Sequence, residues 1–208
     1  MTTSRTRTVS GERSDFRKIY RPFSPYSTLK CLGEPLFRNK HSRAYACLLD
    51  LDPDVITWKC MPEAIVNDSN AARPRWWHVD FAVETSEEAL IVNIWQTSTG
   101  GPGWLPGVVD RMGYRLQQVS MLDLDPVRLQ NAVDLMRYVG SEVPLGDRVR
   151  LLAALDEVGT LTLAESLSVI RESRPMHSVA SLILSGILEV DLSEALLGPD
   201  SVVRRASK

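Results

Sequence analysis

Apolar and polar positions along this chain repeat with two different periods, and the changes of period mark the expected elements. Between residues 39 and 51 apolar side chains recur every three to four positions, which predicts a helix. The run 55–60 is β-branched and aromatic and predicts a strand, with a short second strand over 64–66. The segments 75–83 and 89–95 favour two longer strands, and the second is apolar enough to be buried on both faces.

Beyond residue 100 the pattern turns from strands to helices. A glycine-rich loop occupies 100–103, and residues 108–118 predict a helix, with a strand over 114–121 as the alternative. The dipeptide Asp125-Pro126 is a start signal for the next helix, whose apolar stripe follows directly.

From about residue 144 the apolar positions keep a helical period. Val149, Leu152 and Leu155 predict the inner face of a first helix. Thr162 followed by Glu165 has the spacing of a capping box and predicts the start of a second.

A third helix is expected from about Met176 to Gly186, and strands are expected over 187–192 and 201–204. Three helices followed by a strand, a turn and a strand is the order of a winged helix.

Composition and charge are ordinary except at the N-terminus. The 208 residues are 44 % hydrophobic and 24 % charged, which excludes collagen, extensive disorder and a coiled-coil rod. The net charge is −2, but residues 1–22 hold six basic side chains against two acidic ones. The basic side chains of this predicted flexible arm are Arg5, Arg7, Arg13, Arg17, Lys18 and Arg21. Such an arm is a candidate DNA contact, because cations near phosphates release counterions; a solvated tail is the alternative.

The remaining composition bears on the compartment. The three cysteines are odd in number and form no CxxC pair, so neither a disulfide framework nor a zinc site is suggested. No apolar stretch follows the Arg-rich start, and the best apolar run, 179–190, is too short for a membrane span. We therefore expect a cytoplasmic, soluble protein without a membrane partner.

Four stretches in the middle of the chain resemble the TnsA-like transposon endonucleases, which belong to the PD-(D/E)xK nucleases. Val79-Asp80-Phe81 is similar to the "PDF" of that group, and 91–95 stands where its "hEVK" strand would be. The stretches 113–116 and 128–138 are similar to its "GY" and "RL.NA..L.RY" segments. The resemblance spans roughly residues 34–195 and lies in the order and spacing of the motifs.

The resemblance implies a fold, a domain order and partners. The fold would be α/β, a restriction-endonuclease-like mixed sheet flanked by helices, followed by an α-helical winged-helix-like domain. The arm 1–22 would precede an endonuclease-fold domain at 23–142 and a winged-helix-like domain at 143–208. The implied partners are DNA and a transposase or other mobile-element protein.

The chemistry that the resemblance implies is incomplete in this chain. Metal-dependent phosphodiester cleavage needs at least two carboxylates around Mg²⁺, helped by a lysine. Asp80 is the one catalytic and metal-ligating candidate that remains. Asn93 and Trp95 occupy the positions of the missing Glu and Lys, and the upstream stretch 40–45 holds no acid. We therefore expect a DNA-binding protein with a degraded metal site and no cofactor.

Two other readings stay open from the sequence. An active endonuclease would build an altered Mg²⁺ site from Asp80 with Glu84 or Glu87. A regulatory or adaptor protein would instead use the winged helix for protein contact. Trp76 and Trp77 are expected to pack in the core, with base stacking as the alternative.

The third C-terminal helix is the candidate reader of the DNA major groove. Its polar side chains and the two arginines before it form the predicted DNA-binding set of this domain: Arg171, Arg174, His177, Ser178 and Ser181.

Overall fold

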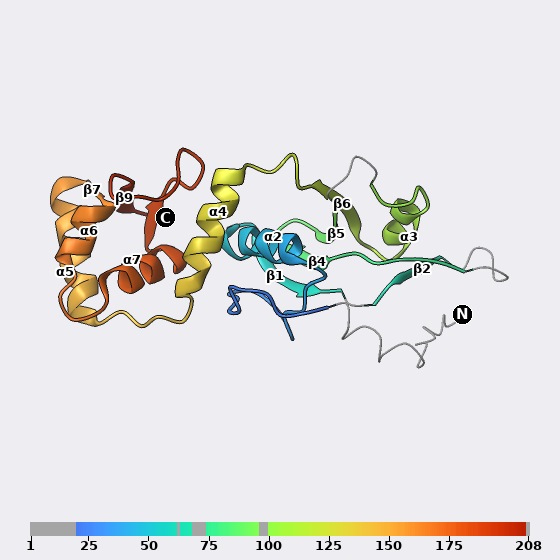
Figure 1. The fold of residues 1–208 in the computed structure, drawn as a ribbon, viewed down its shortest axis with the longest axis horizontal. Helices are drawn as coiled ribbons and strands as arrows, with labels where there is room; N and C mark the ends of the chain where they lie inside the picture. The colour runs from blue at the N-terminus through green and yellow to red at the C-terminus, as the bar shows by residue number, and fades with distance from the viewer. Residues whose placement is uncertain (1–19, 62, 68–73, 96–99, 207–208) are drawn as a thin grey trace.

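The computed structural model describes residues 20–61, 63–67, 74–95 and 100–206 (Figure 1). The first part of the chain contains the following elements: α2 (Lys40–Leu51), β1 (Val55–Cys60), β2 (Ile65–Asn67), β3 (Arg75–Trp77), β4 (Phe81–Thr85), β5 (Ala89–Trp95), α3 (Leu105–Arg111), β6 (Arg115–Ser120), α4 (Pro126–Leu135) and the 3-10 turn η1 (Met136–Tyr138). The C-terminal part contains α5 (Leu145–Val158), β7 (Thr160–Thr162), α6 (Leu163–Val169), α7 (Pro175–Leu184), β8 (Leu188–Val190) and β9 (Val202–Arg205).

A mixed sheet of four strands, in the order β1-β4-β5-β6, forms the centre of the first part. The strands β1, β4 and β5 are antiparallel neighbours, whereas β6 runs parallel to β5. The parallel step needs a crossover connection, and α3 lies between these two strands in the chain. An α/β fold with a mixed sheet flanked by helices is therefore confirmed.

The two faces of this sheet are covered by different helices. Side chains alternate between the faces of a strand, so Phe81 and Val83 face one way and Ala82 the other. The first two pack in one core cluster with Leu49 of α2, and Ala82 packs in another with Val109 of α3. Burial on both faces explains the almost uninterrupted apolar run of β5, as expected from the sequence.

The C-terminal part packs three helices on a small antiparallel sheet in the order β7-β9-β8. Thr162 caps α6 and forms the expected capping box with Glu165. Of the residues expected on the inner face of α5, Leu155 is buried and Leu152 half-buried, whereas Val149 is 56 % exposed. Leu151, which was not expected there, is buried. Because leucines and alanines follow one another in α5, either of two neighbouring helix faces could be the apolar one. The face that is buried is the one that packs against α6 and β9.

The turn between α6 and α7 is held by the buried Asp147 of α5. Its carboxylate accepts hydrogen bonds from the backbone N–H groups of Arg171 and Glu172 and from Ser173 Oγ, and it pairs with Arg150. Burial alone would raise the pKa of Asp147, but these hydrogen bonds outweigh it and hold the pKa below its ordinary value.

Helix α4 lies between the two parts of the molecule (Figure 1). Ala132 and Met136 pack with Cys47 of α2 in one buried cluster. On the C-terminal side, the buried Asn131 donates to the carbonyls of Leu192 and Ala195, at 2.9 and 2.8 Å. Its Oδ1 accepts from the N–H of Leu197 at 2.9 Å. The two parts are therefore linked by packing on α4 and by Asn131.

Two expected elements differ from the structure. The segment 75–83 is not one strand: β3 and β4 are separated at residues 78–80, and they belong to different sheets. A helix over 108–118 is wrong, because α3 ends at Arg111 and β6 follows, which is the alternative that the sequence left open. Within the described residues, no helix is both long and apolar enough to cross a membrane.

Candidate functional site

Asp80 lies at the N-terminal edge of β4, where the chain enters the central sheet. It directly precedes Phe81, which pairs with Val92 of β5, and its own N–H donates to the Val92 carbonyl at 2.9 Å. Asp80 and Asn93 therefore come to neighbouring positions on adjacent strands, as the resemblance implies for its acidic pair. The Asp80 side chain is only 1 % exposed, so its charge has to be compensated within the protein.

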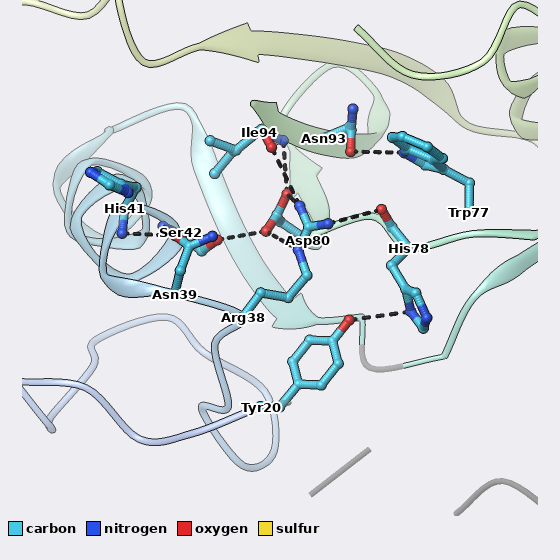
Figure 2. A network of polar contacts seen from close by, with 10 residues as sticks. All are labelled: Tyr20, Arg38, Asn39, His41, Ser42, Trp77, His78, Asp80, Asn93 and Ile94. Carbon is cyan, nitrogen blue, oxygen red and sulfur yellow. Dashed lines mark hydrogen bonds and ion pairs between the residues drawn. The ribbon is translucent and has the colours of Figure 1, made fainter. Parts of the chain in front are cut away.

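The compensating charge comes from Arg38, which lies just before α2 (Figure 2). Its Nε donates to Asp80 Oδ1 at 2.9 Å, and its Nη2 donates to Oδ2. The same guanidinium donates from Nη1 to the His78 carbonyl at 3.2 Å and from Nη2 to the Ile94 carbonyl at 3.4 Å. This bidentate geometry is the strongest form of a charge-assisted hydrogen bond between side chains.

Two further donors complete the surroundings of the Asp80 carboxylate. Ser42 Oγ donates to Oδ1 at 2.6 Å, and the backbone N–H of Ile94 donates to Oδ2 at 2.8 Å. Asn39 caps α2 by accepting from the N–H groups of His41 and Ser42, which fixes the first turn of the helix beside Asp80. Each carboxylate oxygen thus accepts two hydrogen bonds.

The other two positions of the implied catalytic set are neutral. Asn93 is buried, and its Oδ1 accepts a hydrogen bond from Trp77 Nε1 at 3.2 Å (Figure 2). Trp95 is half-buried at the end of β5, where it pairs with Ser120 of β6. Neither side chain supplies a carboxylate or a cation, and Asn93 is a hydrogen-bonded residue of the interior strand β5.

These residues do not fit a divalent metal ion. Mg²⁺ requires oxygen ligands that it can approach directly, and both oxygens of Asp80 already face a guanidinium, a hydroxyl and an N–H group. Across the ranges that the structure describes, no three Asp, Glu, His or Cys side chains gather as a metal site. A positively charged guanidinium stands where the resemblance implies the metal.

The acidic residues after Asp80 do not join it. Glu84 lies at the far end of β4, four residues and roughly 13 Å along the strand, and hydrogen-bonds with Thr57 Oγ1 at 3.2 Å. Glu88 pairs with Arg115 of β6 at the same far end. Glu87 is exposed in the turn after β4. In the described structure neither Glu84 nor Glu87 lies beside Asp80, so an altered Mg²⁺ site built from these carboxylates stays an untested alternative.

Tyr20 covers the edge of the site next to His78. Its hydroxyl lies 3.3 Å from His78 Nδ1, and its side chain is buried (Figure 2). Burial, together with the nearby charge of Asp80 and against that of Arg38, raises the pKa of Tyr20 to about 12. Tyr20 therefore keeps its proton at neutral pH. Arg21 forms a β-bridge with Phe37, so the last residues of the predicted arm belong to the folded body.

The predicted DNA-reading residues of α7 are engaged inside the protein. Ser178 is buried, and its hydroxyl lies 2.6 Å from that of Ser173. Ser181 donates to the Ser141 carbonyl at 2.8 Å. The ring of His177 packs edge-on against Tyr138, with 5.0 Å between the ring centres. In this arrangement the polar face of α7 is turned toward η1 and the segment after it.

The predicted phosphate contacts have separate locations. Arg21, Arg171 and Arg174 are exposed, and the last two flank the turn between α6 and α7. The rest of the arm's basic set lies outside the described residues: Arg5, Arg7, Arg13, Arg17 and Lys18.

Two features escaped the sequence. Arg38 carries no local signal, since its partner is 42 residues away in the chain. The only hint is its place directly before the Asn39 cap, two residues before the upstream stretch 40–45 that lacks an acid. Trp76 was expected in the core and is 65 % exposed, whereas Trp77 is half-buried against Asn93. The packing expectation is thus wrong for Trp76.

Comparison with known proteins identifies no relative from which a function could be transferred. The chain matches no protein-family model, and a search of curated proteins returns no match to it.

Proposed function

We propose that this chain is a DNA-binding protein of a mobile genetic element and resembles the TnsA-like endonuclease subunit. Its metal site is degraded, and it docks on DNA and on a transposase-type partner instead of cutting efficiently. One observation carries the proposal: the ion pair of Arg38 with Asp80, which puts a fixed cation at the position of the implied metal.

The order of elements supports kinship with the nuclease. A helix, three antiparallel strands, a crossover helix and a parallel strand (α2, β1, β4, β5, α3 and β6) build a mixed sheet flanked by helices, which is the coarse architecture that the resemblance implies. Asp80 and Asn93 lie on neighbouring strands of that core, as the Asp and Glu of the family motif do. The fold analogy alone does not establish activity, which depends on the site.

The site itself favours binding over cleavage. Catalysis by Mg²⁺ depends on carboxylates that hold the ion next to the scissile phosphate. Here Arg38 neutralises Asp80, and an amide and an indole replace the other two groups. Arg38 thus neutralises the buried Asp80 carboxylate without a metal.

The C-terminal part supports a winged-helix-like reading. The order α5, β7, α6, α7, β8 and β9, with β9 between β7 and β8, is that of a helix-turn-helix followed by a wing. Because the polar face of α7 is used internally, we assign phosphate contacts to Arg171, Arg174 and the basic arm, and not to major-groove reading by His177 or Ser181.

An adaptor role is the second candidate, and one observation favours it. Leu145 and Val149 lie four residues apart on α5 and are 75 % and 56 % exposed. An exposed apolar stripe on a helix is a common protein-contact surface. On this reading the winged-helix-like part binds protein, and Arg171 and Arg174 have no role in DNA affinity.

Binding of a fluorescein-labelled duplex at a series of salt concentrations tests the DNA proposal. The logarithm of the affinity should fall linearly with the logarithm of the salt concentration, and deleting residues 1–19 should flatten that slope. Absent or salt-insensitive binding contradicts the proposal. A combined Arg171→Ala and Arg174→Ala variant that binds DNA like the wild type, when Leu145→Asp abolishes partner binding, favours the adaptor.

A plasmid-nicking assay tests the degraded site. Wild type and Asp80→Ala should both leave supercoiled DNA intact with Mg²⁺ or Mn²⁺. Metal-dependent nicking by the wild type that disappears in Asp80→Ala means that the site is active, and it refutes this part of the proposal.

A further inference from the structure

Trp76 is an exposed indole on a β-ribbon next to the candidate site. In the pairing of β2 with β3, Trp76 lies opposite Val66, and the two side chains are 65 % and 46 % exposed. The alternate positions Ile65 and Trp77 turn inward and pack in the cluster that covers the α3 side of the sheet. The β2–β3 ribbon is therefore anchored by one face and presents Trp76 on the other.

His78 connects this indole to the start of the described chain. Its ring lies 5.5 Å from the ring of Trp76, in a T-shaped contact, and 6.2 Å from that of Tyr20. Tyr20 and Trp76 thus meet at His78 from segments more than 50 residues apart, and the exposed Arg21 is the residue directly after Tyr20. We name this set the Trp76 surface: Arg21, Val66, Arg75, Trp76 and His78.

The charges of the Trp76 surface suit an anionic partner. Arg75 and Arg21 are exposed and are the only charged residues of β2, β3 and the segment Tyr20–Pro22. The 19 residues that precede Tyr20 add five basic side chains against two acidic ones. Arg75 shares the strand parity of Trp77, so its side chain starts from the opposite face to Trp76, but it is exposed at the end of β3. An exposed indole with accessible arginines in the neighbouring segments suits single-stranded nucleic acid, in which bases stack on aromatic rings and phosphates pair with cations.

We propose that the Trp76 surface binds an unpaired DNA base, stacked on the indole, while the exposed Arg21 and Arg75 attract phosphates of the same strand. This inference rests on the proposed DNA-binding function and specifies its substrate: DNA with a single-stranded or opened segment. Both faces of a base inside a duplex are covered by neighbouring bases, so the indole has access only where the stack is interrupted or ends.

Fluorescence anisotropy with the full-length protein tests this directly. The ligand is a fluorescein-labelled oligothymidine of about 20 nucleotides, longer than the roughly 4–16 nucleotides that single-strand sites span. Trp76→Ala should weaken binding at least about fivefold, and Trp76→Phe should retain most of the affinity because it keeps an aromatic face. Arg75→Ala should lower the slope of log affinity against log salt by about one.

Val158→Ala is the matched control, since it also truncates an exposed apolar side chain (58 %) but lies on α5, at the other end of the molecule (Figure 1). It should leave the affinity unchanged. A blunt-ended duplex of the same length should respond less to Trp76→Ala than the single strand. Circular dichroism of each variant should match the wild type, because Trp76 supports little of the core.

The outcomes separate this inference from the function on which it rests. If the wild type binds DNA and Trp76→Ala binds equally well, the surface serves another partner, such as a protein, and the inference is overturned while DNA binding stands. An equal loss for single strand and duplex also overturns it. If the wild type binds neither DNA, the proposed function fails together with the inference.

Discussion

Replacing Arg38 with alanine removes the only side-chain cation that contacts the Asp80 carboxylate in the described structure. The carboxylate is 1 % exposed and would keep two donors, Ser42 Oγ and the Ile94 N–H. The variant would also lose the donors to the carbonyls of His78 and Ile94. Arg38→Ala therefore leaves a buried negative charge without its countercharge at the start of β4.

The expected cost follows from this burial. Removing one partner of a buried ion pair costs about 3–5 kcal/mol, because the remaining charge stays desolvated. Arg38 is itself 22 % exposed, and two neutral donors to Asp80 remain, so we expect the lower end, about 3 kcal/mol. With a urea dependence of about 2 kcal/mol per molar, the unfolding midpoint should fall by roughly 1.5 M.

Urea unfolding followed by circular dichroism at neutral pH measures this shift. Arg115→Ala is the matched control: Arg115 forms a bidentate ion pair with Glu88 on the same sheet, but both side chains are exposed. Its midpoint should move much less, because exposed pairs are screened by water and salt. Asp80→Asn, alone and combined with Arg38→Ala, completes a double-mutant cycle that isolates the pair.

Two results would refute the reasoning. One is a midpoint for Arg38→Ala that falls no further than that of Arg115→Ala. The other is strict additivity of Arg38→Ala and Asp80→Asn, since a countercharge for Asp80 must couple to it. Either result would mean that Arg38 is not the cation that stabilises the buried Asp80 carboxylate in place of the implied metal.

Three further predictions concern the C-terminal part. The lowered pKa of Asp147 means that its stabilisation is complete above the unfolded carboxyl pKa of about 4 and is lost as the pH falls toward the folded value. The difference in unfolding free energy between wild type and Asp147→Asn should therefore stay constant between about pH 7 and pH 5 and shrink as the pH falls below about 4; a difference that is unchanged in acid contradicts this. Thr162→Ala should destabilise the protein by about 1 kcal/mol in urea unfolding, and Thr162→Ser should not, since serine restores the cap. Asn131→Ala should speed amide hydrogen exchange at 191–197, the segment that Asn131 holds; unchanged exchange would show that other contacts hold it.

Elements with a strong local pattern were predicted from the sequence close to their observed bounds. The helix expected over 39–51 is α2, and the strand expected over 55–60 is β1. The capping box of Thr162 and Glu165 is confirmed as well, because its hydrogen bonds join residues three apart. In each case the residues that form the sequence pattern are also the residues that form the helix, strand or cap.

The sequence-based predictions were wrong where contacts between residues distant in sequence determined the end of a strand or the buried face of a helix. The β-prone run 75–83 is divided at Asp80, whose N–H and carboxylate both bond to β5. The inner face of α5 is defined by Leu151 and not by Val149, because α6 and β9 pack there. The sequence pattern predicted correctly whether a segment is a helix or a strand. Tertiary packing determined where the element ends and which of its faces is buried.

By itself, the sequence determined the α/β class, the order of most elements, the basic composition of residues 1–22 and the absence of acids at two positions of the implied catalytic set. These are properties of residue type and short-range periodicity. Only the tertiary structure decided that Arg38 neutralises Asp80, that the polar face of α7 is internal, and that Trp76 is exposed. Each depends on side chains distant in sequence, whose contacts or exposure are set by the packing of whole elements.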